Sequence, residues 1–141
     1  MKYLLAILLC AGTAQAQYRY NLYTVSGTNA SVSATNATTY NAAADVGPSS
    51  RADIQFVYKL TTNNAANLNQ NVTATFDSSC DGNYYTNQFS ISLAANSNNI
   101  VWMRTNVWVT NSAWLRLVSV TNGNAVAVTN MVIKVGNKIG L

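Results

Sequence analysis

The sequence of 141 residues contains no histidine and no glutamate, and its four acidic residues are all aspartates. Most metal centres, general acid–base pairs and activated nucleophiles depend on histidine or glutamate, so few of them can be built from this chain. Only Asp77 and Asp81 lie close together in the sequence, and a carboxylate pair is the one arrangement left for acid–base catalysis. We therefore predict that the protein is not an enzyme.

Charge and proline are also scarce. Charged residues make up 9% of the chain, its formal net charge is +4, and it contains one proline. The lysines and arginines are scattered and form no basic cluster, which argues against nucleic-acid binding. Hydrophobic residues nevertheless account for 49% of the chain, which is enough for one domain with a single core. The composition predicts a globular domain whose surface is polar but largely uncharged.

The first sixteen residues have the pattern of a signal peptide. Residues 3–12 (YLLAILLCAG) follow a lysine and form an apolar run too short to span a bilayer, and Ala14-Gln15-Ala16 matches a small-x-small cleavage site. We expect cleavage before Gln17 and a secreted protein, at an extracellular or periplasmic surface, without membrane contact after cleavage. The alternative is an uncleaved membrane anchor.

Cleavage would also change the cysteine content of the chain. Cys10 would leave with the signal peptide and Cys80 would remain alone, so no disulfide could form within the mature chain. Because cysteine is commonly buried, we expect a buried, inert thiol rather than one that bridges two chains. Stability would then come from packing.

Apolar and polar residues alternate along many short segments, which is the pattern of strands with one buried face. The expected strands cover residues 19–25, 52–60, 72–76, 85–93, 101–109, 114–120 and 125–135. Asn122-Gly123 predicts a two-residue hairpin turn, and Asp81-Gly82 is a second turn candidate. Strands recur about every eight to twelve residues, so we predict an all-β fold, an antiparallel β-sandwich of jelly-roll or immunoglobulin-like type with about seven to nine strands.

Residues 17–50 and 51–141 are expected to form one domain, with the β-sandwich core in 51–141. The first part holds an N-terminal strand and a segment, residues 27–44, that is rich in Asn, Thr and Ala and has few bulky side chains. We expect this segment to be flexible. The alternatives are a surface loop, a semi-ordered arm that reaches a neighbouring molecule, or an edge strand with long loops.

Residues 77–83 (DSSCDGN) resemble the start of a calcium-binding loop. Oxygen-bearing side chains stand at the first, third and fifth positions and glycine at the sixth. The candidate calcium ligands are Asp77, Ser79, Asp81 and Asn83. Gln88 replaces the bidentate glutamate of a complete loop, so calcium would bind weakly unless another loop contributes. The alternative is an Asx/Gly turn between two strands, and no other cofactor is expected.

A second candidate site is aromatic and cationic. Trp102, Arg104 and Trp108 share one side of a predicted strand, and Trp114 and Arg116 share one side of the next. On neighbouring strands, these five residues would place three indoles and two guanidinium groups on one sheet face. Indoles stack on sugar rings and arginine donates paired hydrogen bonds, so the five residues are candidates for carbohydrate binding. The alternative is that they close the core, with arginine stacked on tryptophan.

Residues 79–86 (SCDGNYYT) and 113–117 (AWLRL) resemble the S-x-D-G-x-x-aromatic-T and aromatic-x-R-L patterns of discoidin-type β-sandwich domains. The same pattern is seen in small β-sandwich proteins of phage virions and bacterial surfaces, and the resemblance covers about residues 51–135. It implies a non-enzymatic sandwich that binds glycans or assembles with other proteins. It also implies that Asp77 and Asp81 shape a loop and that Arg116 lies in a strand next to the core.

Two functions fit these features. The first is a non-catalytic structural or assembly protein that decorates a virion or a bacterial cell surface, with copies of itself or other surface or virion proteins as partners. Sheet edges with few charges favour strand addition between copies. The alternative is a carbohydrate-binding or adhesion module whose partners are glycans.

Overall fold

The computed structural model describes residues 18–27, 30–47, 51–60, 70–94, 100–108 and 112–140, with side chains described except at 18–22, 51, 60, 100–108 and 137–140. The described residues form nine β-strands and no helix, which confirms the all-β class. Accordingly, no membrane-spanning helix occurs among them. The predicted signal peptide, residues 1–16, lies outside the described residues.

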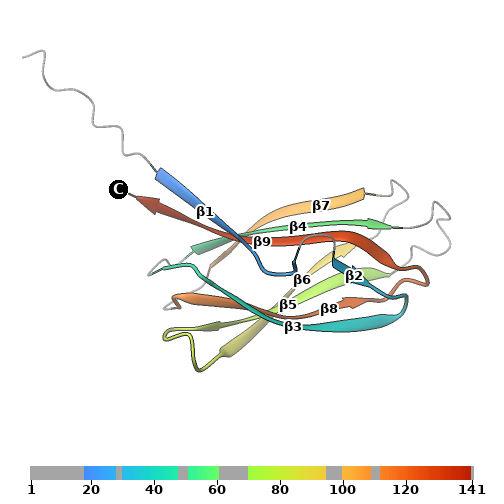
Figure 1. Cartoon of the computed structure of the whole chain (residues 1–141), viewed down its shortest axis with the longest axis horizontal. Coiled ribbons are helices and arrows are strands. Elements are labelled where there is room, and N and C mark those ends of the chain that lie inside the picture. Colours follow the sequence, from blue (N-terminus) through green and yellow to red (C-terminus); the bar gives the residue numbers. More distant parts are fainter. Residues whose placement is uncertain are drawn as a thin grey trace, which may run out of the picture.

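The strands form two antiparallel sheets that lie face to face (Figure 1). The five-stranded sheet has the order β1-β9-β4-β7, with β2 also paired to β9, and consists of β1 (Tyr18–Thr24), β2 (Ala30–Val32), β4 (Arg51–Leu60), β7 (Ile100–Trp108) and β9 (Val128–Gly140). The four-stranded sheet has the order β3-β8-β5-β6 and consists of β3 (Asn36–Asp45), β5 (Asn71–Ser79), β6 (Thr86–Ala94) and β8 (Trp114–Asn122). The predicted antiparallel β-sandwich is therefore confirmed.

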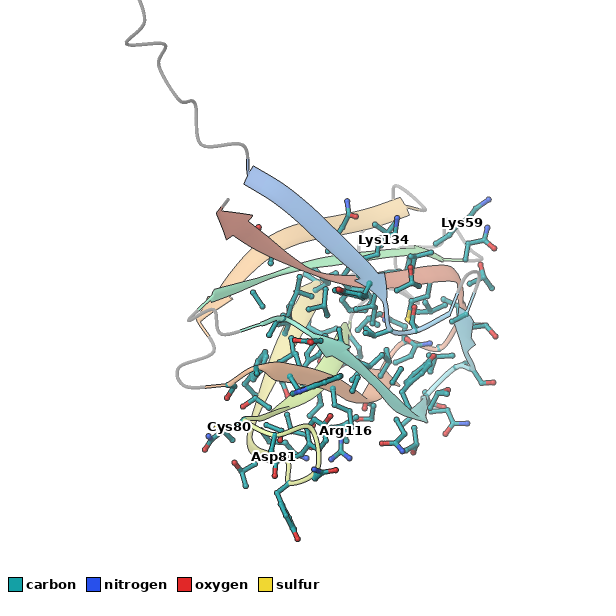
Figure 2. The ribbon with its side chains drawn as sticks, turned by 60° about the vertical axis from the view of Figure 1, so that its left-hand side comes forward. Lys59, Cys80, Asp81, Arg116 and Lys134 are labelled. Atoms are coloured by element: carbon teal, nitrogen blue, oxygen red, sulfur yellow. The ribbon has the colours of Figure 1, made fainter. Side chains whose placement is uncertain are left out.

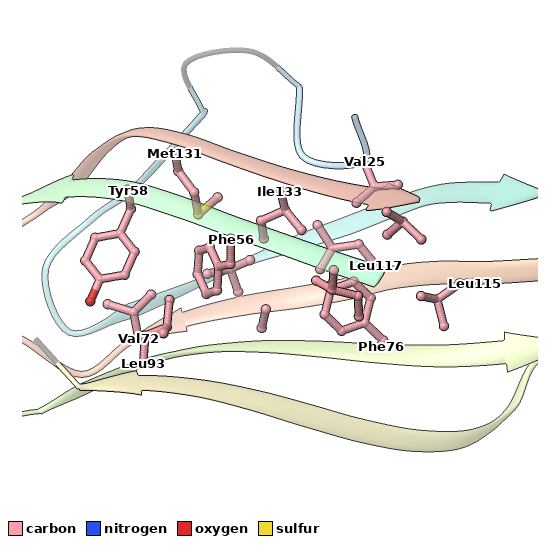
Figure 3. Close-up of a cluster of buried hydrophobic side chains, with 14 of the residues drawn as sticks. Val25, Phe56, Tyr58, Val72, Phe76, Leu93, Leu115, Leu117, Met131 and Ile133 are labelled. Carbon is pink, nitrogen blue, oxygen red and sulfur yellow. The ribbon is translucent and has the colours of Figure 1, made fainter. Parts of the chain in front are cut away.

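The core lies between the two sheets and follows the alternation in the sequence. Ile54, Phe56 and Tyr58 of β4 point inward and are at most 1% exposed, whereas the residues between them are half-buried. They meet Val72 and Phe76 of the opposite sheet and other apolar side chains (Figure 3). Full burial of one large apolar side chain contributes roughly 1.5–3 kcal/mol, so this layer is the main source of stability.

The Asn122-Gly123 hairpin is a wrong prediction. β8 ends at Asn122, but β9 begins at Val128 in the other sheet, so the link crosses between the layers. Gly123 does not adopt the positive φ of a hairpin turn; a Cβ atom there would lie 2.9 Å from Cβ of Gln70. Glycine is therefore required at this position for a close approach. Asp81-Gly82, by contrast, does join two paired strands, β5 and β6.

The crossing link contains two buried asparagines, Asn122 and Asn124, that tie three segments of the chain together. The Asn122 amide nitrogen donates to the carbonyl oxygens of Val126 at 2.7 Å and Ser33 at 3.1 Å. Its oxygen accepts from the backbone and side-chain nitrogens of Asn124, at 3.0 and 3.1 Å. The Asn124 side-chain oxygen accepts from the backbone N–H of Gln70 at 3.1 Å. We call these two residues the asparagine cluster.

The described part of the Asn/Thr/Ala-rich segment contains the strands β2 and β3, as the edge-strand alternative predicts. β3 pairs with β8 from Asn36 to Asp45, and the shorter β2 pairs with β9. Ala44 is buried, and Tyr40 and Ala42 pack against the core. Backbone pairing to a central strand and a few small buried side chains fix the segment, although its composition favours loops. β1 likewise pairs with β9 along its whole length.

Candidate functional site

The β5–β6 loop, residues 80–85, is organised around the Asp81 carboxylate. Its Oδ1 accepts hydrogen bonds from the backbone N–H groups of Asn83 at 2.8 Å and Tyr84 at 3.0 Å and from the Ser79 hydroxyl at 2.8 Å. The Ser79 oxygen in turn accepts from the N–H of Gly82 at 3.0 Å. These contacts are those of an Asx turn, so the predicted Asx/Gly turn is present. They hold the loop in one conformation.

The indole of Trp114, on β8, lies close to the backbone of this loop at Gly82. Gly82 has a φ of +77°, and a Cβ atom on it would lie 3.1 Å from the Trp114 indole. Only glycine combines that backbone conformation with so close an approach. The loop backbone at Gly82 therefore packs against the half-buried indole of Trp114.

Arg116 of β8 and Asp77 of β5 lie directly opposite one another and form a bidentate ion pair. Arg116 Nε lies 3.0 Å from Asp77 Oδ1, and its Nη2 lies 2.6 Å from Oδ2. The guanidinium group also covers the ring of Tyr85, with its central carbon 3.9 Å from the ring centroid. The hydrogen bonds that Arg116 donates to Asp77 raise the pKa of Arg116. Arg116 and Asp81 lie in the same part of the molecule, while Lys59 and Lys134 lie in the other sheet (Figure 2).

A cleft of about 400 Å³ opens at this loop, and we call it the loop cleft. Its lining residues come from the end of β5, the loop, the start of β6 and the residues before β8: Ser78, Ser79, Cys80, Asp81, Tyr84, Thr86, Asn87 and Ser112. Ser112 donates to the Ser78 hydroxyl at 3.1 Å, which joins two walls of the cleft. The lining is rich in hydroxyl groups, and among its described residues Asp81 is the only charged one.

β6 contains an extra residue where it lines the loop cleft. Between the pairs Phe76–Phe89 and Ser78–Thr86, β5 advances by two residues and β6 by three. The additional length includes Asn87, whose φ is +56°. Bulges of this kind redirect side chains and are common beside binding sites.

Asp81 gives a testable pH dependence. Its hydrogen bonds, led by those from the Tyr84 and Asn83 backbone, lower its pKa from 3.8 to about 2. A carboxylate with a lowered pKa in the folded state stabilises the fold above its unfolded pKa, and that contribution disappears as the pH falls through about 2. We therefore expect the amide NMR signals of Asn83 and Tyr84 to titrate with a midpoint near pH 2.

The Asp81→Asn variant is the control for this titration, because asparagine keeps the accepting oxygen but cannot ionise over this range. Its Asn83 and Tyr84 amides should show no acid transition. A midpoint near the ordinary value of 3.8 in the unmodified chain would contradict the described loop.

The tryptophan–arginine face predicted from the sequence is not formed. β7 lies in the five-stranded sheet and β8 in the four-stranded sheet, so Trp102, Arg104 and Trp108 are separated from Trp114 and Arg116. Alternation assigns a residue to one side of its strand, but it does not reveal which sheet the strand joins. The side chains of Trp102, Arg104 and Trp108 lie outside the described residues. Of the other two, Trp114 supports the β5–β6 loop and Arg116 pairs with Asp77.

The four candidate calcium ligands are divided between two interactions. Asp77 is bound to Arg116, whereas Ser79, Asp81 and Asn83 form the Asx turn. No group of three or more Asp, Glu, His or Cys side chains that could hold a metal ion occurs within the described ranges. The resemblance implied that both aspartates shape a loop, and here Asp81 organises it while Asp77 holds Arg116.

Two features of the cleft were missed or misjudged from the sequence. Cys80 was expected to be buried, but it is exposed, because β5 ends at Ser79 and the chain turns outward there. Tyr84, Asn87 and Ser112 were not singled out. The exposed position of Tyr84 follows from the Asx turn, and Ser112 joins the cleft only through the pairing of β8 with β5. Local patterns carry no signal for that pairing.

Comparisons with known proteins find similarity at the level of the fold. No protein-family model and no curated protein sequence matches the chain. The VP2 subviral particle of infectious bursal disease virus is 11% identical with a TM-score of 0.53, over 88% of this chain and 33% of that chain. The enzymatically active domain of tailspike protein 4 of bacteriophage CBA120 is 11% identical with a TM-score of 0.51, over 89% of this chain and 20% of that chain. A carbohydrate-binding module of Cellvibrio mixtus lichenase 5A in complex with cellotriose is 14% identical with a TM-score of 0.44, over 84% of this chain and 88% of that chain.

The viral and phage structures confirm the resemblance to β-sandwich domains of virions that the sequence motifs indicated. This chain spans about a third of the virus chain and about a fifth of the tailspike chain. At 11% identity the likeness concerns the fold.

Proposed function

We propose that this chain is an exported, non-catalytic structural protein of a virion or bacterial surface, and that copies of it associate through β6. The observation that carries the proposal is the edge formed by β6 on the four-stranded sheet. An edge strand presents N–H and C=O groups that have no partner in the sheet, and a second copy can pair with them. The VP2 subviral particle, whose chain contains a sandwich of the same fold, supports the choice of an assembly role.

The part of β6 from Phe89 to Ala94, beyond the extra residue at its start, lacks the devices that usually protect a sheet edge. From Phe89 to Ala94 its register with β5 is uninterrupted, and the segment contains no charged residue and no proline. Ser90 and Ser92 are exposed, yet their hydroxyls bond to Thr75 and Thr73 on β5, at 3.0 and 2.8 Å. They are therefore directed along the sheet towards β5. Long, regular, uncharged edges of this kind favour pairing with another chain.

The opposite edge of the same sheet, β3, is better protected. Its register shift, between Thr39 and Ala42, lies in the middle of the strand, whereas that of β6 lies at the start, and β3 ends at the charged Asp45. A bulge and a charge both disfavour edge pairing. We therefore assign the contact to β6. Two copies joined in this way would be related by a two-fold axis, and the β6 strand of each copy would pair with the β6 strand of the other.

The contacts of three of the four aspartates support a non-catalytic role. Asp77 is held by Arg116, Asp81 Oδ1 accepts three hydrogen bonds, and Asp45 Oδ1 accepts from the N–H of Gly47 at 2.7 Å. The chain contains no histidine or glutamate, so Asp53 is the one further residue of the His/Asp/Glu type that could relay a proton.

Size-exclusion chromatography with light scattering and negative-stain imaging tests the assembly proposal. The unmodified protein should form a defined oligomer, ring or fibre. Replacing Ser90 and Ser92 together by lysine should weaken association by about tenfold or more, because like charges then face each other across the joined edges. Folding should be unaffected, since both serines are exposed.

The matched control replaces Ser119 and Thr121 by lysine. These residues lie across from Thr75 and Thr73 on the central strand β8, so the same two charges are added to the same sheet but away from the edge. Association of this variant should match that of the unmodified protein. A monomer at high concentration, or equal weakening in both variants, would exclude the β6 contact.

A further inference from the structure

We propose that the loop cleft is a binding site for a neutral saccharide. Its walls provide hydroxyl groups from Ser78, Thr86 and Ser112 and the amide of Asn87, which can donate and accept hydrogen bonds. A volume of about 400 Å³ is at the small end of ligand-binding pockets and suits a short saccharide segment. This proposal does not depend on association through β6, since the cleft lies beyond the uninterrupted part of that edge.

The lining disfavours other classes of ligand. Asp81 is the only charged residue among the described ones that line the cleft, so phosphates, nucleotides and other anions would meet its negative charge with no cation among those residues to balance it. Its Oδ1 already accepts three hydrogen bonds, so a metal ion bound at Oδ1 would have to displace them. The described residues that line the cleft include no aliphatic side chain, so they offer little surface to a lipid or an apolar peptide.

Tyr84 provides the apolar contact that a sugar ring needs. Its side chain is 81% exposed, the most exposed of the large hydrophobic residues described, and it lies at the cleft. An aromatic ring in this position can pack against the apolar face of a sugar. The backbone N–H of Tyr84 is held by Asp81 at 3.0 Å, so the ring is presented by an ordered segment. Preorganisation of this kind reduces the entropy lost on binding.

Asn87 contributes a polar group from β6. Its φ of +56° and the extra residue of β6 occur together at the point where the strand lines the cleft. Regular pairing of β6 with β5 would require neither the extra residue nor the positive φ of Asn87. The irregularity gives the cleft a polar amide in addition to its hydroxyl groups.

NMR titration of the full chain, processed by its expression host, tests the site. The probes are neutral trisaccharides: cellotriose, maltotriose, β-1,4-galactotriose and triacetylchitotriose. At least one should shift the amide signals of Tyr84, Thr86 and Asn87 in a saturable way. Tyr84→Ala should weaken that binding by about tenfold or more, and it should fold normally because the side chain is exposed.

Tyr23→Ala is the matched control. Tyr23 is the other exposed large aromatic among the described side chains, at 39%, and it lies on β1 in the five-stranded sheet, away from the loop cleft. It should bind as the unmodified chain does, and so should the Ser90→Lys/Ser92→Lys variant if the assembly contact and the cleft are separate. If no probe shifts the cleft amides at millimolar concentration, or if Tyr84→Ala binds equally well, the saccharide proposal is wrong.

Discussion

Asn122→Ala should lower the free energy of unfolding by about 3 kcal/mol or more, because several buried groups lose their partners at once. The side chain is fully buried and is the only one described that bonds to both the Ser33 and Val126 carbonyl oxygens. A buried polar group left without a partner costs about 1–3 kcal/mol, and here two carbonyls and the Asn124 amide are affected. Water that enters the space left by the Asn122 side chain would bond to some of these groups. The expected loss is therefore smaller than the sum of their separate costs.

Urea denaturation and thermal unfolding measure this effect, and the melting temperature should fall by roughly 10 °C. Asn36→Ala is the matched control. Asn36 stands directly across the ladder from Asn122, but it is exposed, and its side-chain oxygen accepts only from the N–H of Ala37, at 2.8 Å. Its loss should change stability by less than about 0.5 kcal/mol. Equal effects of the two substitutions would show that the asparagine cluster does not hold the link in place.

The same cluster illustrates what alternation and turn signals can predict. The alternation of residues 52–60 is correct for β4, and Ile54, Phe56 and Tyr58 all enter the core. Period-two alternation is a local property of the strand, so it survives in the sequence. The Asn122-Gly123 dipeptide was misread because the same residues that suit a hairpin also suit a buried amide and a close backbone approach. Only the position of the neighbouring segments distinguishes the two.

In the candidate site, too, the sequence predicts features made by neighbouring residues but not those that depend on strand order. The Asx turn at Asp81 was foreseen as an alternative because it is made by residues within a few positions of one another. The loop cleft was not foreseen, because Ser112 and Thr86 approach Ser78 only through the order of β8, β5 and β6 in the sheet. The tryptophan–arginine face failed for the related reason that consecutive strands β7 and β8 lie in different sheets.

Removing Arg116 should cost more than removing its partner Asp77, although each forms one half of the same ion pair. The Asp77 side chain is 7% exposed and that of Arg116 is 29% exposed. Arg116→Met therefore leaves a nearly buried carboxylate without a partner, whereas Asp77→Asn leaves a guanidinium group that can turn towards water. Breaking a fully buried pair costs about 3–5 kcal/mol, and partial exposure reduces the expected loss for Arg116→Met to about 2 kcal/mol.

A double-mutant cycle measured by urea denaturation isolates the pair. The variant with both substitutions should be more stable than the sum of the single losses implies, by about 1 kcal/mol, because it buries no unpartnered charge. Lys59→Met is the control for losing a cation elsewhere, since Lys59 is exposed on the other sheet, and it should change stability by less than about 0.5 kcal/mol. Additive losses would mean that the two side chains do not interact in solution.

The Arg116→Met variant also separates a structural role from the ligand-binding role that the sequence pattern suggested. If Arg116 acts through Asp77 and the ring of Tyr85, the folded variant should bind trisaccharides as the unmodified chain does, despite its lower stability. Arg116 does not line the loop cleft, whereas Tyr84 does, so binding and stability should respond to different residues. Loss of saccharide binding in folded Arg116→Met would instead place the guanidinium group in contact with the sugar, and the site would extend from the cleft across β8.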